Sequence, residues 1–384
     1  MKQILFNKPS DKMHTIWEDL VNNPPKDYEY VLSKNKLTIG RMTSLKKYKV
    51  IHYLYKNIFQ KIITPVEISN KFISIPHDID LIFSPNLPIY QKFPWVVSLE
   101  EVYSLAGNNK YVWEKNKGKI EEILSSKYCK KIMPFTEFGK RTFEGKLNIS
   151  GFEDKIEVVC IATYVPKIKA EKDSKFVNII FVGTSNQIDP EIFNMKGGRE
   201  TIEAFKILSK KYKNVKLKII SNIPKDIDTN IERLEILPLM DRKKVFQLYA
   251  ESDIFLAPSY LGLGMAIVEA LGSGLPLVCG DTLGLEEAID KDNKNGLLIN
   301  IKNKGRYKYG GISIQDFSCY TKYIYDNNKD NIVKEIVENV SILVEDNKLR
   351  VEMGVASREK YEKEFSIEAR NKKLKRIFNE SINR

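Results

Sequence analysis

Cysteine and histidine are scarce in this chain of 384 residues, which contains four cysteines and three histidines. The cysteines are far apart, at Cys129, Cys160, Cys279 and Cys319. Their spacing predicts neither a disulfide framework nor a metal site, and the histidines are too few and too scattered for a zinc centre. Because unpatterned cysteines are typical of reducing compartments, the sequence favours a cytoplasmic protein.

Long apolar runs are also missing. No stretch reaches the roughly 20 apolar residues that a membrane-spanning helix needs. The first residues, MKQILFNKPSDK, lack the apolar segment of a signal peptide. A hydrophobic content of 42% with mixed charges predicts a soluble globular protein. Since single cores rarely grow past about 250 residues, the length predicts two domains.

Basic residues exceed acidic ones, and the formal net charge is +12. This balance favours an anionic partner: a nucleic acid, a phosphorylated small molecule or an acidic membrane surface. Residues 33–61 contain eight Lys or Arg residues and no acid, with Tyr48, Tyr53, Tyr55 and Phe59 between them. Such a segment fits a membrane surface, a single-stranded nucleic acid, or a helix with a solvated basic face.

Short apolar segments alternate with helical patterns along most of the chain, which predicts doubly wound parallel sheets. In the first half we expect strands at 81–83, 95–99 and 155–163, and helices at 117–126 and 137–143. The polar, proline-led stretch 166–175 predicts a linker between two domains, 1–168 and 169–366. In the second half we expect strands at 176–182, 215–220, 254–257, 275–279 and 296–299, and helices at 199–212, 242–250, 265–271 and 331–383, the last interrupted at Gly354 and Phe365.

The stretch APSYLGLGMAIVEALGSGLPLV, residues 257–278, combines a glycine turn with a single acid. A turn through Gly262 and Gly264 into a helix places free N–H groups and a positive dipole end where an anion can bind. Glu269, in the second turn of that helix, can accept two hydrogen bonds from a vicinal diol such as a ribose. Alternatively, the glycines serve only the turn and Glu269 is a solvated helix acid.

The pattern P-S-x-x-G-x-G-x-x-x-x-E-A-L-x-S-G-x-P resembles the donor-site signature of retaining glycosyltransferases of family 4. That resemblance implies an α/β GT-B fold, with two facing Rossmann-like domains and a C-terminal helix, about 367–384, that crosses back to the first. The family has two glutamates eight residues apart. Glu269 matches the second, which the family uses on the ribose, whereas the first, near the donor sugar, is Leu261 here.

The resemblance covers residues 176–384 well and the first half loosely. Lys196-Gly197-Gly198 is similar to the pair whose lysine reaches the donor diphosphate, where a fixed ammonium stabilises the leaving group. The family's arginine after Gly183 is missing, and Arg199 is the candidate to replace it. The residues expected to contact the donor are Gly183, Thr184, Lys196, Gly197, Arg199, Ser259, Gly262, Leu263, Gly264, Glu269 and Thr282.

In the first half, Glu100 stands where many family members have a histidine near the acceptor. It either orients an acceptor hydroxyl or is an acid at a helix start. We expect Thr136 to cap a short helix. The expected catalytic residues are therefore Glu100, Lys196 and Glu269.

The resemblance implies a retaining glycosyltransferase of the hexosyltransferase type, which moves a sugar from a nucleotide-sugar to a glycan or lipid-linked acceptor. No metal or other cofactor is expected, and the string Asp78-Ile79-Asp80 is interpreted as chance. Residues 33–61 suggest peripheral contact with the inner face of an anionic membrane. The alternatives are a non-catalytic nucleotide-sugar-binding subunit, because of Leu261, a GT-B epimerase or phosphorylase, and, less favoured, a nucleic-acid-binding protein.

Overall fold

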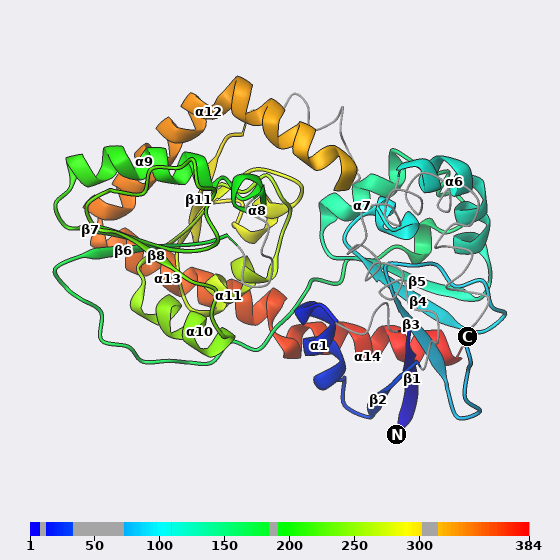
Figure 1. The fold of residues 1–384 in the computed structure, drawn as a ribbon. Helices are drawn as coiled ribbons and strands as arrows, with labels where there is room; N and C mark the ends of the chain where they lie inside the picture. Colours follow the sequence, from blue (N-terminus) through cyan, green and yellow to red (C-terminus); the bar gives the residue numbers. More distant parts are fainter. Residues whose placement is uncertain (8–12, 34–72, 109, 184–190, 302–313, 384) are drawn as a thin grey trace. The chain divides into compact units, whose positions relative to one another are not determined.

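The computed structural model describes residues 1–383 apart from 8–12, 34–72, 109, 184–190 and 302–313. Thr184 and, except for Ser33, the basic segment 33–61 lie outside the described residues. The chain forms two compact units (Figure 1). Unit 1 consists of Met1–Ala162, Gly311–Gln315 and Ile367–Arg384, and unit 2 of Thr163–Gly310 and Asp316–Ser366. The two units meet in the chain between Ala162 and Thr163, a few residues before the domain boundary expected after residue 168.

Unit 1 contains a five-stranded parallel sheet with the order β2-β1-β3-β4-β5. Its strands are β1 (Lys2–Phe6), β2 (Tyr28–Leu32), β3 (Leu81–Pro85), β4 (Trp95–Leu99) and β5 (Cys129–Pro134). Every residue of β3 and β4 is buried, as expected for central strands of a parallel sheet covered on both faces. The expected strands at 81–83 and 95–99 are confirmed.

Helices cover this sheet. They are α1 (Thr15–Asn22), α6 (Lys110–Ser125), α7 (Glu137–Glu144) and α14 (Ile367–Asn383), with 3-10 turns at Val102–Ala106 and Glu153–Lys155. Thr136 accepts a hydrogen bond from Gly139 N at 3.0 Å, which confirms the expected cap of α7. The C-terminal helix α14 returns to unit 1, where Phe378 packs on Tyr28 with ring centroids 5.3 Å apart.

The expected strand at 155–163 is wrong. Only Ile156 forms a β-bridge, with Ile132, and the chain then continues without strand pairing. Val159, Ile161 and Ala162 are nevertheless buried. The apolar run therefore reflects burial of a connecting segment, and burial alone does not require a ladder.

Unit 2 contains a six-stranded parallel sheet with the order β11-β10-β9-β6-β7-β8. Its strands are β6 (Val177–Val182), β7 (Val215–Ile220), β8 (Leu234–Leu237), β9 (Ile254–Ala257), β10 (Leu277–Gly280) and β11 (Gly296–Ile299). The chain runs outward from β6 to β8 and then returns to β9 on the other side of β6. Ligands of such folds bind at the carboxyl ends of the strands at this switch point.

The helices of unit 2 are α8 (Glu191–Met195), α9 (Gly198–Lys211), α10 (Arg242–Glu251), α11 (Met265–Gly272), α12 (Ile314–Glu345, of which 314–315 belong to unit 1) and α13 (Asn347–Lys360), with a 3-10 turn at Leu285–Ala288 and a π-helical turn at Tyr361–Phe365. The expected interruption at Gly354 is wrong, because α13 continues through it. The small residue allows close packing, since a Cβ on Gly354 would lie 2.6 Å from the carbonyl oxygen of Gly274.

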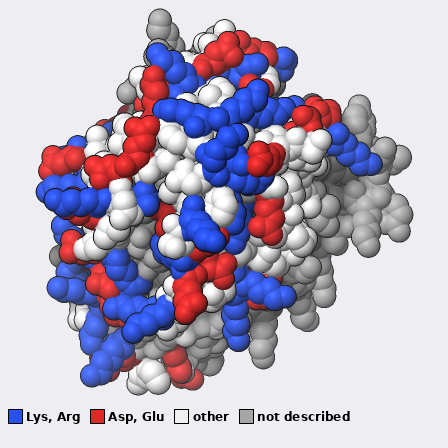
Figure 2. Space-filling model, turned by 90° about the vertical axis from the view of Figure 1, so that its left-hand side faces the viewer, with Lys and Arg blue, Asp and Glu red and all other residues white. Residues whose placement is uncertain are grey.

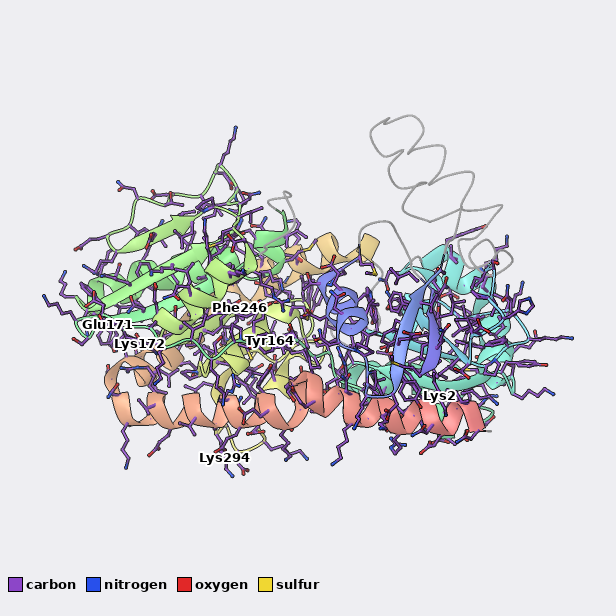
Figure 3. The ribbon with its side chains drawn as sticks, turned by 90° about the horizontal axis from the view of Figure 1, so that it is seen from below. Lys2, Tyr164, Glu171, Lys172, Phe246 and Lys294 are labelled. Carbon is purple, nitrogen blue, oxygen red and sulfur yellow. The ribbon has the colours of Figure 1, made fainter. Side chains whose placement is uncertain are left out.

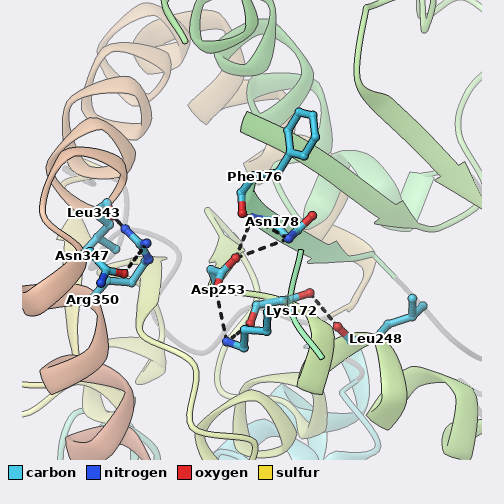
Figure 4. A network of polar contacts seen from close by, with 9 residues as sticks. Lys172, Phe176, Asn178, Leu248, Asp253, Leu343, Asn347 and Arg350 are labelled. Atoms are coloured by element: carbon cyan, nitrogen blue, oxygen red, sulfur yellow. Dashed lines mark hydrogen bonds and ion pairs between the residues drawn. The ribbon is translucent and has the colours of Figure 1, made fainter. Parts of the chain in front are cut away.

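A polar clamp fixes the neighbouring strands β6 and β9 at their starts (Figure 4). The Asp253 carboxylate, just before β9, accepts hydrogen bonds from Asn178 N at 2.9 Å and from Lys172 Nζ at 3.2 Å. Asp253 N donates in turn to the carbonyl oxygen of Asn178 at 2.7 Å. These bonds set the register of the two strands whose other ends form the switch point.

Charged side chains project outward from both units, with Glu171 and Lys172 at an outer edge of unit 2 (Figure 3). On the face drawn in Figure 2, Lys and Arg side chains are interspersed with Asp and Glu. The net positive charge is therefore not gathered into a single basic patch on that face. Within the described part of the chain, no helix is both long and apolar enough to cross a membrane.

Candidate donor-binding site

The loop that carries Lys196 is pressed against the segment after β9. Gly197 has a φ of +74°, and a Cβ there would lie 2.2 Å from the carbonyl oxygen of Pro258. Tyr260 N donates to the carbonyl oxygen of Met195 at 3.0 Å. Only glycine satisfies both the left-handed backbone and the close approach, so Gly197 fixes the position of Lys196 relative to this segment.

Two helices, α9 and α11, begin near Lys196 without a side-chain cap. Gly197 precedes α9 and Gly264 precedes α11, and neither has a side chain to accept from the first N–H groups. A Cβ on Gly264 would lie 3.8 Å from Lys196 Nζ, so the ammonium group lies beside the start of α11. Unsatisfied N–H groups, the dipole end and a fixed ammonium together favour an anion.

Lys196, Ser259 and Gly262 line one small pocket of unit 2. Its other lining residues are apolar: Phe181, Val182, Phe255, Ala257, Ala266, Ile267 and Leu285. Phe181, Val182 and Ala257 come from the carboxyl ends of β6 and β9, so the pocket lies at the switch point of the sheet. Three residues that the sequence assigned to the donor are therefore brought together where this fold class binds ligands.

Internal hydrogen bonds hold the glycine turn in shape. Ser259 Oγ accepts from Leu261 N at 3.1 Å, and Leu263 is buried. Thr282 is fully buried and its hydroxyl donates to the carbonyl oxygen of Ser259 at 2.7 Å. This hydroxyl is engaged inside the protein, where it positions the turn. The expected contact of Thr282 with the donor therefore stays a prediction for its backbone.

Glu269 is 7% exposed, so the alternative of a solvated helix acid is wrong. Arg242 Nε donates to Glu269 Oε1 at 2.7 Å, and the Tyr249 hydroxyl donates to Oε2 at 3.4 Å. Arg242 also donates to the Thr163 hydroxyl. These two donors hold the carboxylate of Glu269 in a fixed orientation.

No functional role was expected for Arg242 or Tyr249, because the pattern of helix 242–250 is typical of a core helix. The available signal was the spacing: residues seven apart lie on one face of a helix, so α10 can direct Arg242 and Tyr249 to the same acid. What the sequence lacks is any indication that this face meets Glu269, since that contact joins two different helices.

Arg199 does not line this pocket. Its Nε donates to Asn194 Oδ1 at 3.0 Å and its Nη2 forms an ion pair with Asp226 at 2.8 Å. Phosphate binding by Arg199 would therefore require this ion pair to open. Gly183 directly follows β6, and a Cβ there would lie 2.3 Å from Ser221 Oγ, so packing against Ser221 explains this glycine.

A buried acid that the sequence missed supports the same segment. Glu200, in the first turn of α9, is 1% exposed and accepts a hydrogen bond from the fully buried Tyr260 hydroxyl. Glu200 Oε2 has no hydrogen-bond partner among the described residues. Burial raises the pKa of Glu200 to about 7, although the bond from Tyr260 lowers it. The pair joins the start of α9 to the turn that follows Ser259.

Glu100 belongs to unit 1, where it is exposed directly after β4. The residue at the helix start is instead Glu101, which precedes the 3-10 turn Val102–Ala106. Burial, and then the neighbouring Glu100 charge, raise the pKa of Glu101 well above its ordinary value. The exposed position of Glu100 at a strand end is compatible with the expected role toward an acceptor.

Sequence comparisons place the switch-point pocket within a known domain. Residues 176–307 match the family described as glycosyl transferases group 1. An uncharacterized glycosyltransferase of Haemophilus influenzae is 25% identical over 195 residues, which cover 48% of this chain and 51% of that protein. D-inositol 3-phosphate glycosyltransferase of Nocardia farcinica is 35% identical over 69 residues, or 18% and 15% of the two chains. The chain thus spans about half or less of these relatives.

Solved structures share the architecture of both units. Anabaena Alr3699/HepE, crystallised with UDP and glucose, has a TM-score of 0.62 at 12% identity, covering 99% of this chain and 100% of that one. The pneumococcal O-GlcNAc transferase GtfA, crystallised with UDP and GlcNAc, has a TM-score of 0.56 at 15% identity over 79% and 57% of the chains. The predicted GT-B fold is confirmed, and within it residues 176–307 match the family of glycosyl transferases group 1.

Proposed function

We propose that this protein is a retaining glycosyltransferase of the family 4 type that uses a nucleotide-sugar donor. One observation carries the proposal: Lys196 lies beside the uncapped start of α11, in a pocket at the switch point of unit 2. A diphosphate fits that arrangement because it brings two anionic groups to fixed N–H dipoles and an ammonium. The presence of UDP in related structures makes a uridine donor the first choice.

Each polar group of the site has a part in this reaction. Breaking the bond between the sugar C1 and the phosphate oxygen leaves charge on the nucleoside diphosphate, which Lys196 and the start of α11 stabilise. The acceptor oxygen bonds to C1 on the same face, and its proton passes to the leaving phosphate. Glu269, oriented by Arg242 and Tyr249, accepts hydrogen bonds from the ribose diol. No step uses a carboxylate at position 261, and no metal is needed in this scheme.

The acceptor in this proposal is a glycan or a lipid-linked molecule, and unit 1 provides its site, with Glu100 orienting the attacking hydroxyl. The protein works in the cytoplasm, with residues 33–61 in contact with an anionic membrane surface. A second candidate, a donor-binding subunit without transferase activity, is favoured by one observation: Leu261 occupies the place of the first family glutamate.

A panel of UDP-, GDP- and ADP-sugars tests the proposal, scored by thermal stabilisation and by slow donor hydrolysis. We expect one donor to give both. Lys196→Ala should lower donor affinity or hydrolysis about a hundredfold, since single charge-stabilising groups have effects of that order. Lys206→Ala is the control. It removes a lysine of the neighbouring helix α9 that pairs with Asp228, and it should change neither donor affinity nor donor hydrolysis. Stabilisation without turnover, even with acceptors supplied, would favour the binding subunit; no stabilisation by any donor would contradict both.

The role of Glu269 can be separated from that of Lys196 by comparing UDP with 2′-deoxy-UDP. If Glu269 holds the ribose diol, the protein should prefer UDP by about tenfold, roughly the value of one charge-assisted hydrogen bond. Glu269→Ala should abolish this preference, whereas Lys196→Ala should weaken both ligands equally. Calorimetric titration measures the six affinities, those of two ligands for three proteins. A preference that survives in Glu269→Ala would show that another residue reads the ribose.

A further inference from the structure

The chain enters unit 2 at residues 163–165, where buried and exposed side chains alternate. Thr163 is fully buried and Val165 is buried, whereas Tyr164 between them, labelled in Figure 3, is largely exposed. These residues pair with no described strand, so contacts other than a sheet ladder hold the segment in place. Those contacts lead to the acid that we assign to the donor ribose.

The π-helical turn Tyr361–Phe365 holds the backbone of this segment. The Tyr361 hydroxyl donates to the carbonyl oxygen of Thr163 at 2.7 Å and accepts from Val165 N at 3.1 Å. Thr163 N donates to the carbonyl oxygen of Phe365 at 3.4 Å. None of these three bonds uses the Thr163 hydroxyl, so the backbone of the segment is fixed without it.

The Thr163 hydroxyl contacts the guanidinium of Arg242. Arg242 Nη2 donates to Thr163 Oγ1, while Arg242 Nε donates to Glu269 Oε1 at 2.7 Å. The guanidinium carbon also lies 5.3 Å from the centre of the Phe246 ring. One guanidinium thus joins the entry segment of unit 2 to Glu269. Because its N–H donors form a rigid planar fork, the acceptor at Thr163 helps to set how Nε meets the carboxylate.

The helix that carries Glu269 also packs on this segment. Gly272 follows Glu269 by three residues in α11, and a Cβ there would lie 2.6 Å from Val165 Cγ2 and 3.0 Å from Tyr361 Cδ2. The end of α11 is therefore pressed against the segment, in addition to the link through the guanidinium. All of these residues belong to unit 2, so the arrangement is complete within that unit.

Holding the chain in place does not by itself require a hydroxyl at position 163. Valine has nearly the shape of threonine, and the backbone bonds to Tyr361 and Phe365 would remain with it. What valine lacks is an acceptor for Arg242 Nη2. The Arg242 side chain is 32% exposed, so without that acceptor the guanidinium would turn partly to water and hold Glu269 less firmly.

We propose that Thr163 is a positioning residue for recognition of the donor ribose. Its hydroxyl holds Arg242, and Arg242 holds the Glu269 carboxylate in the orientation that accepts the ribose diol. Thr163 acts through Arg242 and not on the donor itself. The inference rests on the proposed function, because it takes Glu269 as the acid that binds the ribose.

The affinities of Thr163→Val for UDP and 2′-deoxy-UDP, measured by calorimetry, test the proposal. The unmodified protein should prefer UDP about tenfold, and Thr163→Val should lower this preference to about threefold or less. Thr163→Ser keeps the hydroxyl and should keep the preference. The ratio of the two affinities is the informative quantity, because partial unfolding weakens both ligands equally. A full preference for UDP in Thr163→Val would overturn the proposal.

Further variants separate this role from a structural one. Thr321→Val is the matched control, because Thr321 is a buried threonine of unit 2 whose hydroxyl has no hydrogen-bond partner among the described residues, and it should keep the preference. Should Thr163→Val fail to fold, Thr163→Ala serves instead, because it removes the hydroxyl without placing a methyl group against the guanidinium. In a Glu269→Ala background, Thr163→Val should cause no further loss of UDP affinity. A further loss would show that Thr163 acts by another route.

The two proposals fail in different ways. If the unmodified protein binds no UDP, or binds it without preference over 2′-deoxy-UDP, the ribose role of Glu269 is wrong and the role of Thr163 falls with it. If the unmodified protein shows the preference and Thr163→Val retains it, the donor site stands and only the role of Thr163 is wrong.

Discussion

The two units differ in how some of their helices begin. In unit 1 a side chain caps the first turn of α1 and of α7: His14 accepts from Ile16 N, and Thr136 accepts from Gly139 N. In unit 2 Asp241 caps α10 and Asp346 caps α13 in the same way, but α9 and α11 follow glycines and have no side-chain cap. These two helices meet at Lys196. A ligand, in our proposal the donor diphosphate, takes the place of the missing caps.

Glycines differ in the space around them within both units. At Gly197 and Gly183 in unit 2 a Cβ would overlap neighbouring atoms, as it would at Gly139 in unit 1. Gly118 and Gly145 in unit 1 have open space around them. Substitution of one glycine from each group therefore tests whether the pocket depends on close backbone approach. All three tryptophans belong to unit 1, so their fluorescence reports on that unit separately.

The largest effect is expected for Gly197→Ala. Alanine would be strained at a φ of +74°, and its Cβ would overlap the Pro258 carbonyl, which together should cost about 2–4 kcal/mol of stability. Because the loop carries Lys196, donor affinity should fall with it. Circular dichroism should show unit 2 melting earlier, with the tryptophan transition unchanged. The control, Gly145→Ala, should alter neither; a normal melt for Gly197→Ala would contradict the close approach.

Some residues of the donor site could be predicted from the sequence, and others could not. The residues of the donor pocket that we predicted come from two short stretches, a Lys-Gly pair and a glycine turn, whose roles depend on backbone geometry. Such roles leave a short pattern in the sequence. Arg242, Tyr249 and Thr282 left none, because their contacts with Glu269 and Ser259 join elements that only the fold brings together.

The positions of most strands could be predicted, since short apolar runs alternate with helical patterns. The prediction failed at 155–163, where burial without pairing produces the same apolar run as a strand. It also missed β1 and β2 in unit 1, and it missed β8, an edge strand whose side chains are largely exposed, so that no apolar run marks it.

A second effect, of intermediate size, concerns pH. The pKa of Glu200 is raised to about 7 from an ordinary value of 4.5, so the folded state holds this proton more tightly than the unfolded state. The resulting stabilisation is complete below about pH 4.5 and is lost as the pH rises through 7. Glu200→Gln should therefore flatten the decline of unit 2 stability between pH 5 and 8. Above pH 8 the variant should be more stable, by about 3 kcal/mol at most.

Melting temperatures across this pH range provide the measurement. Glu203→Gln is the matched control, since Glu203 lies on the same helix, partly exposed and 3.9 Å from Lys329, and its loss should leave the pH dependence in place. The tryptophan signal of unit 1 should show no change in either variant. If Glu200→Gln declined as steeply as the unmodified protein, the buried pair with Tyr260 would not be the source of the pH dependence.

The smallest effect has the opposite sign and belongs to unit 1. Gly118 is exposed within α6, and a Cβ there meets nothing within 4 Å. Glycine in a helix interior costs about 0.5–1 kcal/mol relative to alanine, so Gly118→Ala should stabilise unit 1 by that amount. Denaturant unfolding followed by tryptophan fluorescence should show a higher midpoint with an unchanged slope, and donor affinity should stay the same. A loss of stability would mean that Gly118, like Gly197, meets a neighbour, and the contrast between the two groups of glycines would then fail.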